Sequence, residues 1–394
     1  MKRSSTISLL VVLWLAAAGA ASAQQGMVQP APETPEMELP VLLHQLEERG
    51  ITLSLGYTAE IFSAVSGGVG RGRRSDYLGS FAPSLTLDFS RIGFGRGQFY
   101  MSGQTLHGRG ISESRIGTAQ ALSNLEEQRF SRFIEAWYAD SYRNGLLTIK
   151  MGRQYADADF GVVENGADFL NSSYGLNPTT PMPTFPAPEL GASVWVAPAS
   201  WFSAGAGVFK GGTLDALTED GVAMNRRPFA MFEARFEAFG KNAASHGQYS
   251  IGLWRQSRGA WLSAGEENAA PVRNYGIYAT ADHWFMRSPS GEHRGPGLFF
   301  QWGWTPADRN EITGYTGGGV AWAGLIPARR RDSIGMGVTR ARLVGRDSEN
   351  IIEWFYKLQV TSKLMVQPDL QWVLNPSGDN RRALVAGLRL GVEF

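Results

Sequence analysis

Charged and amide side chains recur at alternate positions of several otherwise apolar segments. In 350–360, Glu353 and Lys357 alternate with Trp354 and Tyr356. Successive strand side chains point to opposite faces, so such a segment has one polar and one apolar face. The polar positions taken from this pattern are Glu135, Lys150, Glu233, Arg235, Glu353, Lys357, Asp369, Gln371 and Arg389. Opposite charges along a water-filled channel would orient hydroxyl-bearing solutes and set ion preference.

The polar face needs water, because a charge in a soluble core costs several kcal/mol unless it is paired. The apolar face then needs lipid or a packed partner sheet. A soluble sandwich offers the partner sheet, whereas a transmembrane β-barrel combines a lipid-facing surface with a watery lumen. A closed barrel also has no free strand edges. The repetition of charge on strand after strand favours the barrel.

The last segment, 383–394, shows the pattern most clearly. Leu384, Leu388 and Phe394 belong to its apolar set, and Arg389 and Glu393 belong to the other. Sixteen such strands are predicted, at 51–65, 76–91, 97–107, 129–142, 146–155, 191–199, 201–210, 228–238, 248–257, 273–286, 297–305, 313–325, 332–344, 350–362, 364–375 and 383–394. The predicted class is all-β: a transmembrane antiparallel up-and-down β-barrel of about 16 strands.

The connections between these strands alternate in length. Short ones lie at 91–96, 143–145, 198–200 and 361–363, and long ones at 66–75, 108–128, 156–190, 211–227 and 258–272. Short periplasmic turns opposite long external loops are typical of bacterial outer-membrane barrels.

The N-terminus predicts export. Lys2 and Arg3 precede an apolar run, 7–15, which leads to small residues ending in Ala21-Ser22-Ala23. This is the pattern of a signal peptide over 1–23, and the run is too short for a transmembrane helix.

A linker and a short amphipathic helix on the periplasmic side are expected over 24–48. Leu39, Leu42, Leu43 and Leu46 have helical spacing, and Gly50 is a suitable C-terminal cap. The barrel is then expected to span 49–394, and the family resemblance described below implies that loop 156–190 folds inward.

Composition restricts the function. The chain has no cysteine, so no disulfide framework stabilises it, while glycine numbers 48 and aromatic residues reach 11%. The net charge of +1 predicts neither a nucleic-acid nor an anionic-membrane partner.

Catalytic motifs do not occur in the sequence. His44, His107, His246, His283 and His293 have no metal-binding spacing, and there is no G-x-S-x-G motif. We therefore expect no cofactor, no metal and no enzyme activity. A lipid-modifying barrel enzyme with a Ser–His pair and a structural or adhesin barrel are the alternatives to a channel.

Several blocks resemble the OprB-type carbohydrate-selective porins. At the end of the chain these are Pro368-Asp369-Leu370-Gln371-Trp372, Asn375-Pro376-Ser377-Gly378 and Ala386-Gly387-Leu388-Arg389, followed by the terminal Phe394. Upstream they are Gly50-Ile51-Thr52 with Tyr57, Ile134-Glu135-Ala136-Trp137-Tyr138, Asn171-Ser172-Ser173, Pro178, and 186–191. The resemblance covers nearly all of 45–394. It implies a sixteen-stranded outer-membrane channel for sugars, with carbohydrate solutes and outer-membrane lipid as partners. Monomer and homo-oligomer both fit it.

Loop 156–190 is the longest predicted connection. Five prolines stiffen it, and Phe169, Tyr174 and Phe185 are interspersed among them. Loops of this length are uncommon unless functional, and aromatic faces suit sugar rings. From the residues alone, a constriction and an external loop packed on its neighbours are equally supported. The resemblance favours the constriction.

Overall fold

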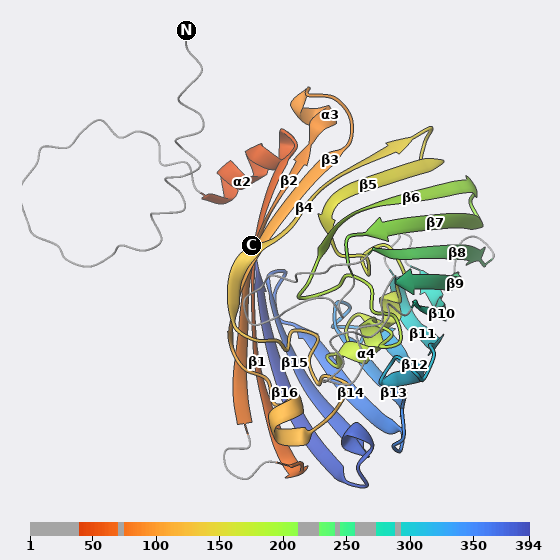
Figure 1. The fold of residues 1–394 in the computed structure, drawn as a ribbon. Helices are drawn as coiled ribbons and strands as arrows, with labels where there is room; N and C mark the ends of the chain where they lie inside the picture. The colour runs from red at the N-terminus through yellow and green to blue at the C-terminus, as the bar shows by residue number, and fades with distance from the viewer. Residues whose placement is uncertain (1–38, 70–74, 212–227, 241–244, 257–272, 288–292) are drawn as a thin grey trace, which may run out of the picture. The chain divides into compact units, whose positions relative to one another are not determined.

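The computed structural model describes residues 39–69, 75–211, 228–240, 245–256, 273–287 and 293–394 (Figure 1). The predicted signal peptide, 1–23, and the first part of the predicted linker, 24–38, lie outside these residues. The chain divides into the units 1–44 and 45–394. The predicted amphipathic helix is present as α2 (Leu39–Glu48), and Gly50 follows it with a φ of 83°. Its periplasmic location stays a prediction.

Sixteen antiparallel strands form one closed barrel, so the predicted fold class is confirmed (Figure 1). The strands are β1 (Ile51–Gly67), β2 (Ser75–Asp88), β3 (Gln98–Gly108), β4 (Phe130–Tyr142), β5 (Leu147–Gln154), β6 (Glu189–Ala199), β7 (Phe202–Phe209), β8 (Phe229–Phe239), β9 (His246–Gln256), β10 (Asn274–Arg287), β11 (His293–Trp304), β12 (Ile312–Ala323), β13 (Ser333–Leu343), β14 (Glu349–Gln359), β15 (Leu364–Leu374) and β16 (Arg382–Glu393).

The barrel closes where the first strand meets the last. In the β1–β16 register, Glu60 lies opposite Arg389 and Ile61 lies opposite Leu388. Ile61 and Leu388 are exposed on the outer face, whereas Glu60 is buried and forms an ion pair with Arg389. The two faces of the last strand are therefore assigned as the sequence predicts.

Apolar side chains cover the outer face of the barrel. Along β13, Ile334, Met336 and Val338 are exposed, while Gly335 and Gly337 between them are buried. An exposed apolar surface of this kind suits the hydrocarbon interior of a bilayer. Among the described residues, no helix is long and apolar enough to cross a membrane.

Local turn chemistry ends two strands. The predicted strand 76–91 stops at Asp88, since its carboxylate accepts hydrogen bonds from the N–H groups of Ser90 (3.0 Å) and Arg91 (3.3 Å). This cap begins the short helix α3 (Phe89–Ile92). After β4, the four-residue connection 143–146 has positive φ at Arg143, Asn144 and Gly145, and the Leu146 N–H donates to the Arg143 carbonyl (3.3 Å) to close the turn.

Two long connections fold into the barrel. The β3–β4 loop, 109–129, contains the π-helix η2 (Ser112–Ile116), and the β5–β6 loop, 155–188, contains the 3-10 turn η3 (Glu164–Gly166) and the helical turn α4 (Ser172–Gly175). Figure 1 shows α4 within the ring of strands. A further 3-10 turn, η6 (Pro376–Gly378), connects β15 to β16.

Candidate pore constriction

Buried side chains of the barrel wall bind the backbone of loop 155–188. Glu353 of β14 has no exposed surface, and its carboxylate accepts hydrogen bonds from the N–H groups of Leu170 (2.6 Å) and Asn171 (3.1 Å). Gln371 of β15 accepts one from the Asn171 side chain (3.2 Å). These contacts hold the middle of the loop against β14 and β15. The buried N–H groups of Leu170 and Asn171 thereby have acceptors on the wall.

A second set of wall carboxylates holds the first third of the loop. Asp282 of β10 accepts hydrogen bonds from the N–H groups of Glu164 and Asn165 and from the Asn165 side chain. Glu233 of β8 accepts from the N–H of Gly161 (2.6 Å) and from the Tyr278 hydroxyl (2.8 Å). The loop therefore spans the barrel interior from β8 to β15.

Loop residue Asp168 is held from three strands. Its carboxylate forms an ion pair with Lys357 of β14 (2.7 Å) and accepts a hydrogen bond from Ser333 of β13 (2.6 Å). Gln367 of β15 donates to the Asp168 carbonyl (2.6 Å). Farther along, Gln301 of β11 donates to the Tyr174 carbonyl (2.5 Å).

An aromatic cluster packs the same part of the loop. Phe169 stacks on Tyr174 at 4.4 Å between ring centroids and meets Phe299 and Phe355 of the wall edge-to-face. Phe169 and Tyr174 are only 1% and 0% exposed. Their ring faces therefore stabilise the loop and are covered from solute, unlike the sequence-based expectation that they would be available to sugars.

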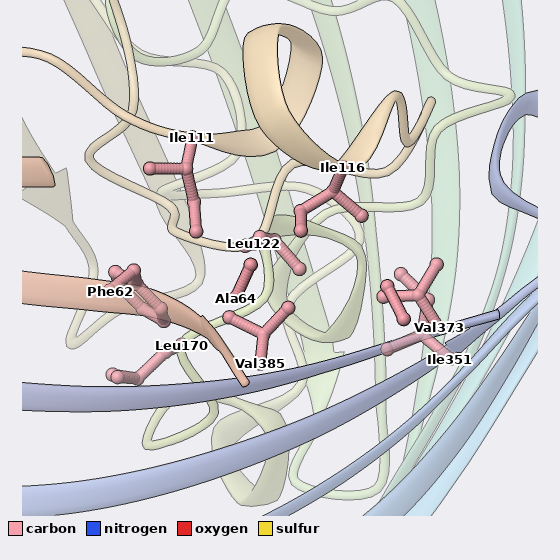
Figure 2. Packing of buried hydrophobic residues seen from close by; sticks show 10 residues of the cluster. Phe62, Ala64, Ile111, Ile116, Leu122, Leu170, Ile351, Val373 and Val385 are labelled. Atoms are coloured by element: carbon pink, nitrogen blue, oxygen red, sulfur yellow. The ribbon is translucent and has the colours of Figure 1, made fainter. Parts of the chain in front are cut away.

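Loop 109–129 joins this arrangement through an apolar cluster. Figure 2 shows Ile111, Ile116 and Leu122 of this loop beside Leu170 of the longer loop. The remaining members are Phe62, Ala64, Ile351, Val373, Ala383 and Val385, which come from β1, β14, β15 and β16. The two loops thus form one apolar core with the inner wall.

Two buried carboxylates bind loop 109–129. Glu349 accepts hydrogen bonds from the N–H groups of Ala119 (2.8 Å) and Gln120 (2.8 Å). Glu60 accepts from the Ser123 hydroxyl (2.6 Å) and from Arg389, which also donates to Asn124 (2.6 Å).

The sequence-predicted polar residues separate into two groups. Glu233, Glu353, Lys357, Gln371 and Arg389 contact an inward-folded loop directly, as described above. Asp369 is buried beside Gln371, which donates to its Oδ1 (3.0 Å). Glu135, Lys150 and Arg235 contact the first residues of loop 155–188, at Tyr155 and Asp159.

Two wall cations contact the first part of loop 155–188 at Asp159. Lys150 forms an ion pair with Asp159 (3.0 Å) and lies 4.6 Å from the centroid of the Trp137 ring. Arg235 donates to the Asp159 carbonyl (2.8 Å) and lies over the Trp195 ring at 4.3 Å. Cations and aromatic faces are therefore adjacent at this position.

An open pocket of about 340 Å³ lies beside the two ends of loop 155–188. Its lining comes from β1 to β4, from Glu393 of β16 and from the loop, and includes Tyr100, Gln104, Glu135, Tyr155 and Phe185. Glu135 accepts hydrogen bonds from the Tyr155 N–H (3.2 Å) and the Trp137 indole (3.2 Å). Phe185 is thus the one predicted loop aromatic that borders open space.

One loop carboxyl is poorly accommodated. Asp157 Oδ2 accepts a hydrogen bond from Thr184, but its buried Oδ1 has no hydrogen-bond partner. Burial raises the pKa of Asp157 to about 6, against the smaller lowering effect of the Thr184 hydrogen bond.

The sequence analysis missed several residues of this site. Asp282, Glu60 and Gln104 stand on predicted strands at inward positions, so the same alternation could have found them. Asp168 and Asn171 lie in the loop, where no periodicity marks a contact. Among the described residues, no group of acidic, histidine or cysteine side chains could hold a metal ion.

Comparisons with known proteins agree with the barrel. Residues 73–394 match the family model described as carbohydrate-selective porin, OprB family. Porin B of Pseudomonas aeruginosa is 23% identical over 403 residues, covering 89% of each chain. The high-pH structure of Pseudomonas putida OprB has a TM-score of 0.78 at 21% identity, covering 89% of this chain and 96% of that one. The low-pH structure has a TM-score of 0.62 at 19% identity, covering 91% and 98%.

Proposed function

Because this chain belongs to the OprB family of carbohydrate-selective porins, we propose that loop 155–188 sets the narrowest part of its solute path. The protein is a porin of the bacterial outer membrane, and sugars diffuse through its lumen. It belongs to a family of channels, so neither the barrel enzyme nor the adhesin is retained as its function. The proposal concerns which part of the lumen limits the solutes.

The observation that carries the proposal is the attachment of the loop to the inner wall from β8 to β15. Glu233, Asp282 and Glu353, on three separate strands, each accept hydrogen bonds from loop N–H groups. A sixteen-stranded barrel is wide enough for an aqueous channel, so what fills it determines the remaining width. Because loop 155–188 covers the inner wall from β8 to β15, the open path for solutes lies beside β1 to β5.

The pocket on that side offers groups that suit a sugar. Tyr100 and Tyr155 have aromatic faces and hydroxyl groups, and Gln104 and Glu135 provide hydrogen-bonding groups. Sugars need both kinds of contact, since each ring has C–H-rich faces and a rim of hydroxyl groups. We assign solute contact to these four side chains and to Lys150 and Arg235, which both contact Asp159.

The nine predicted polar residues thereby receive two roles. Glu135, Lys150 and Arg235 contact the solute path, where they influence ion preference. Glu233, Glu353, Lys357, Asp369, Gln371 and Arg389 hold the two loops in position. Phe169 and Tyr174 stiffen loop 155–188, and Phe185 narrows the opening.

Removal of the Phe185 ring tests the constriction. Phe185→Ala should raise single-channel conductance in planar bilayers and admit larger oligosaccharides in liposome swelling. Phe94→Ala is the matched control, since Phe94 is 80% exposed in the connection between β2 and β3. Unchanged conductance and size limit in Phe185→Ala, with the barrel folded, would place the constriction elsewhere.

A further inference from the structure

The charged residues of the strands are sorted by face. In the described strands, the carboxylates nearest the long loops are inward or shielded, and none is exposed on the outer wall at that end. Outward positions at the same end carry exposed arginines, at Arg255, Arg340, Arg342 and Arg382. The outer wall therefore has a cationic rim at this end although the net charge of the whole chain is only +1. For this reason the net charge does not exclude binding to an anionic membrane surface.

Arg340 and Arg342 form the densest part of this rim. They are two residues apart on one face of β13, about 6.6 Å along the strand. Their cross-strand neighbours Thr316, Asn350 and Gly314 carry no charge. Within the described part of the chain, neither guanidinium has a hydrogen-bond or ion-pair partner.

Tryptophans place these arginines at the edge of the bilayer. Trp302 and Trp304 of β11 lie opposite Thr316 and Gly314 of β12, in the same cross-strand rows as the two arginines. Both indoles are exposed outward, at 39% and 41%. Exposed aromatic residues form girdles at the membrane interface, so Arg340 and Arg342 lie at the height of lipid headgroups.

An apolar groove lies on the outer wall on the hydrocarbon side of the arginines. It has a volume of about 670 Å³, and its outward lining includes Val320, Trp322, Ile334, Met336, Trp354 and Leu370. Met336 is four residues from Arg340 on β13, or about 13 Å along the strand. A lipid with its headgroup on the arginines has acyl chains long enough to reach the groove.

We propose that the outer face of β11–β13 binds a phosphorylated glycolipid of the external leaflet, with a phosphate on Arg340 and Arg342 and an acyl chain in the groove. Guanidinium groups bind phosphate through paired hydrogen bonds, and two adjacent unpaired cations favour an anion between them. The long loops mark the external end of an outer-membrane barrel, where the leaflet consists of such glycolipid.

Native mass spectrometry of the detergent-solubilised full-length barrel with bisphosphorylated lipid A tests this site. In Arg340→Gln/Arg342→Gln, lipid A affinity should fall by roughly tenfold or more, since two charge-assisted contacts are lost. Monophosphorylated lipid A should bind more weakly than the bisphosphorylated form, and phosphatidylcholine should show no dependence on the arginines.

Arg331→Gln is the matched control, because Arg331 is an exposed arginine in the connection at the opposite end of β13. It should bind lipid A as the wild type does, and sugar flux should be normal in both variants.

Unchanged affinity in the double variant, or an equal loss in Arg331→Gln, would overturn the site. Equal affinity for phosphatidylglycerol would overturn the glycolipid assignment, and a changed oligomeric state without changed lipid binding would assign the face to a second copy of the chain.

Discussion

The inner wall from β8 to β15 and the inner wall from β1 to β5 follow the same alternation but have different surroundings. On the first, Glu233, Gln301 and Glu353 have no exposed surface because loop 155–188 covers them. On the second, Tyr100 and Gln104 remain partly exposed and line the open pocket. An inward polar residue of a barrel can therefore hold a loop or contact solute. Which role it takes depends on where the loops lie.

Arg389→Leu should cause the largest loss of stability. Arg389 lies on β16, at the boundary between these two regions. The substitution leaves the Glu60 carboxylate, which is 1% exposed, without its cation, and it removes the contact with Asn124. Breaking a buried pair in this way costs about 3–5 kcal/mol. Urea unfolding in lipid vesicles would measure the loss, and a loss as small as that of an exposed residue would contradict the role of this pair.

Glu353→Ala tests the covered wall. It leaves the buried N–H groups of Leu170 and Asn171 without an acceptor, at about 1–3 kcal/mol each. We expect lower stability, faster amide hydrogen exchange over 164–176, and noisier single-channel currents. Normal exchange in that segment would show that Glu353 does not hold the loop.

Gln104→Ala is the matched change on the open wall. Gln104 is partly exposed and donates one hydrogen bond, to Ser80 (2.8 Å), so unfolding should become easier by only about 0.5–1.5 kcal/mol. Sugar discrimination in liposome swelling should change although the barrel is nearly as stable. A loss as large as that of Glu353→Ala would remove the distinction between the two walls.

The protonation of Asp157 should have the smallest effect on the stability of the loop, and the size of this effect depends on pH. Its native pKa of about 6 lies above that of an unfolded aspartate, so the native loop favours the protonated form. This contribution to stability is fully present below about pH 4 and is lost as the pH rises through about 6. Amide exchange in loop 155–188, corrected for intrinsic rates, should be slower at pH 5 than at pH 7. In Asp157→Asn this difference should shrink.

The sequence predicts the barrel well because its signal is local. Alternation in 383–394 is sufficient to separate Leu388 from Arg389, and all sixteen strands are found within a few residues of their predicted ends. The strand at 76–91 is predicted too long because the capping role of Asp88 depends on side-chain geometry that alternation does not reveal.

The site is predicted less completely because its contacts are distant in sequence. Glu353 and Gln104 are both inward polar residues, and nothing near either one distinguishes them. Glu353 meets Leu170 across 183 residues of chain, and only the folded loop shows which wall it covers. The burial of Phe169 and Tyr174 likewise depends on Phe299 and Phe355 of the wall that the loop covers.

Cysteine accessibility tests the central claim most directly, since the chain has no native cysteine. Phe185→Cys borders the open pocket, whereas Thr339→Cys lies on the inner face of β13 with no exposed surface. A bulky methanethiosulfonate reagent should modify position 185 and reduce single-channel current, and it should leave position 339 unmodified with the current unchanged. Rapid modification and block at position 339, with none at 185, would mean that solutes pass along β13 and that loop 155–188 does not set the constriction.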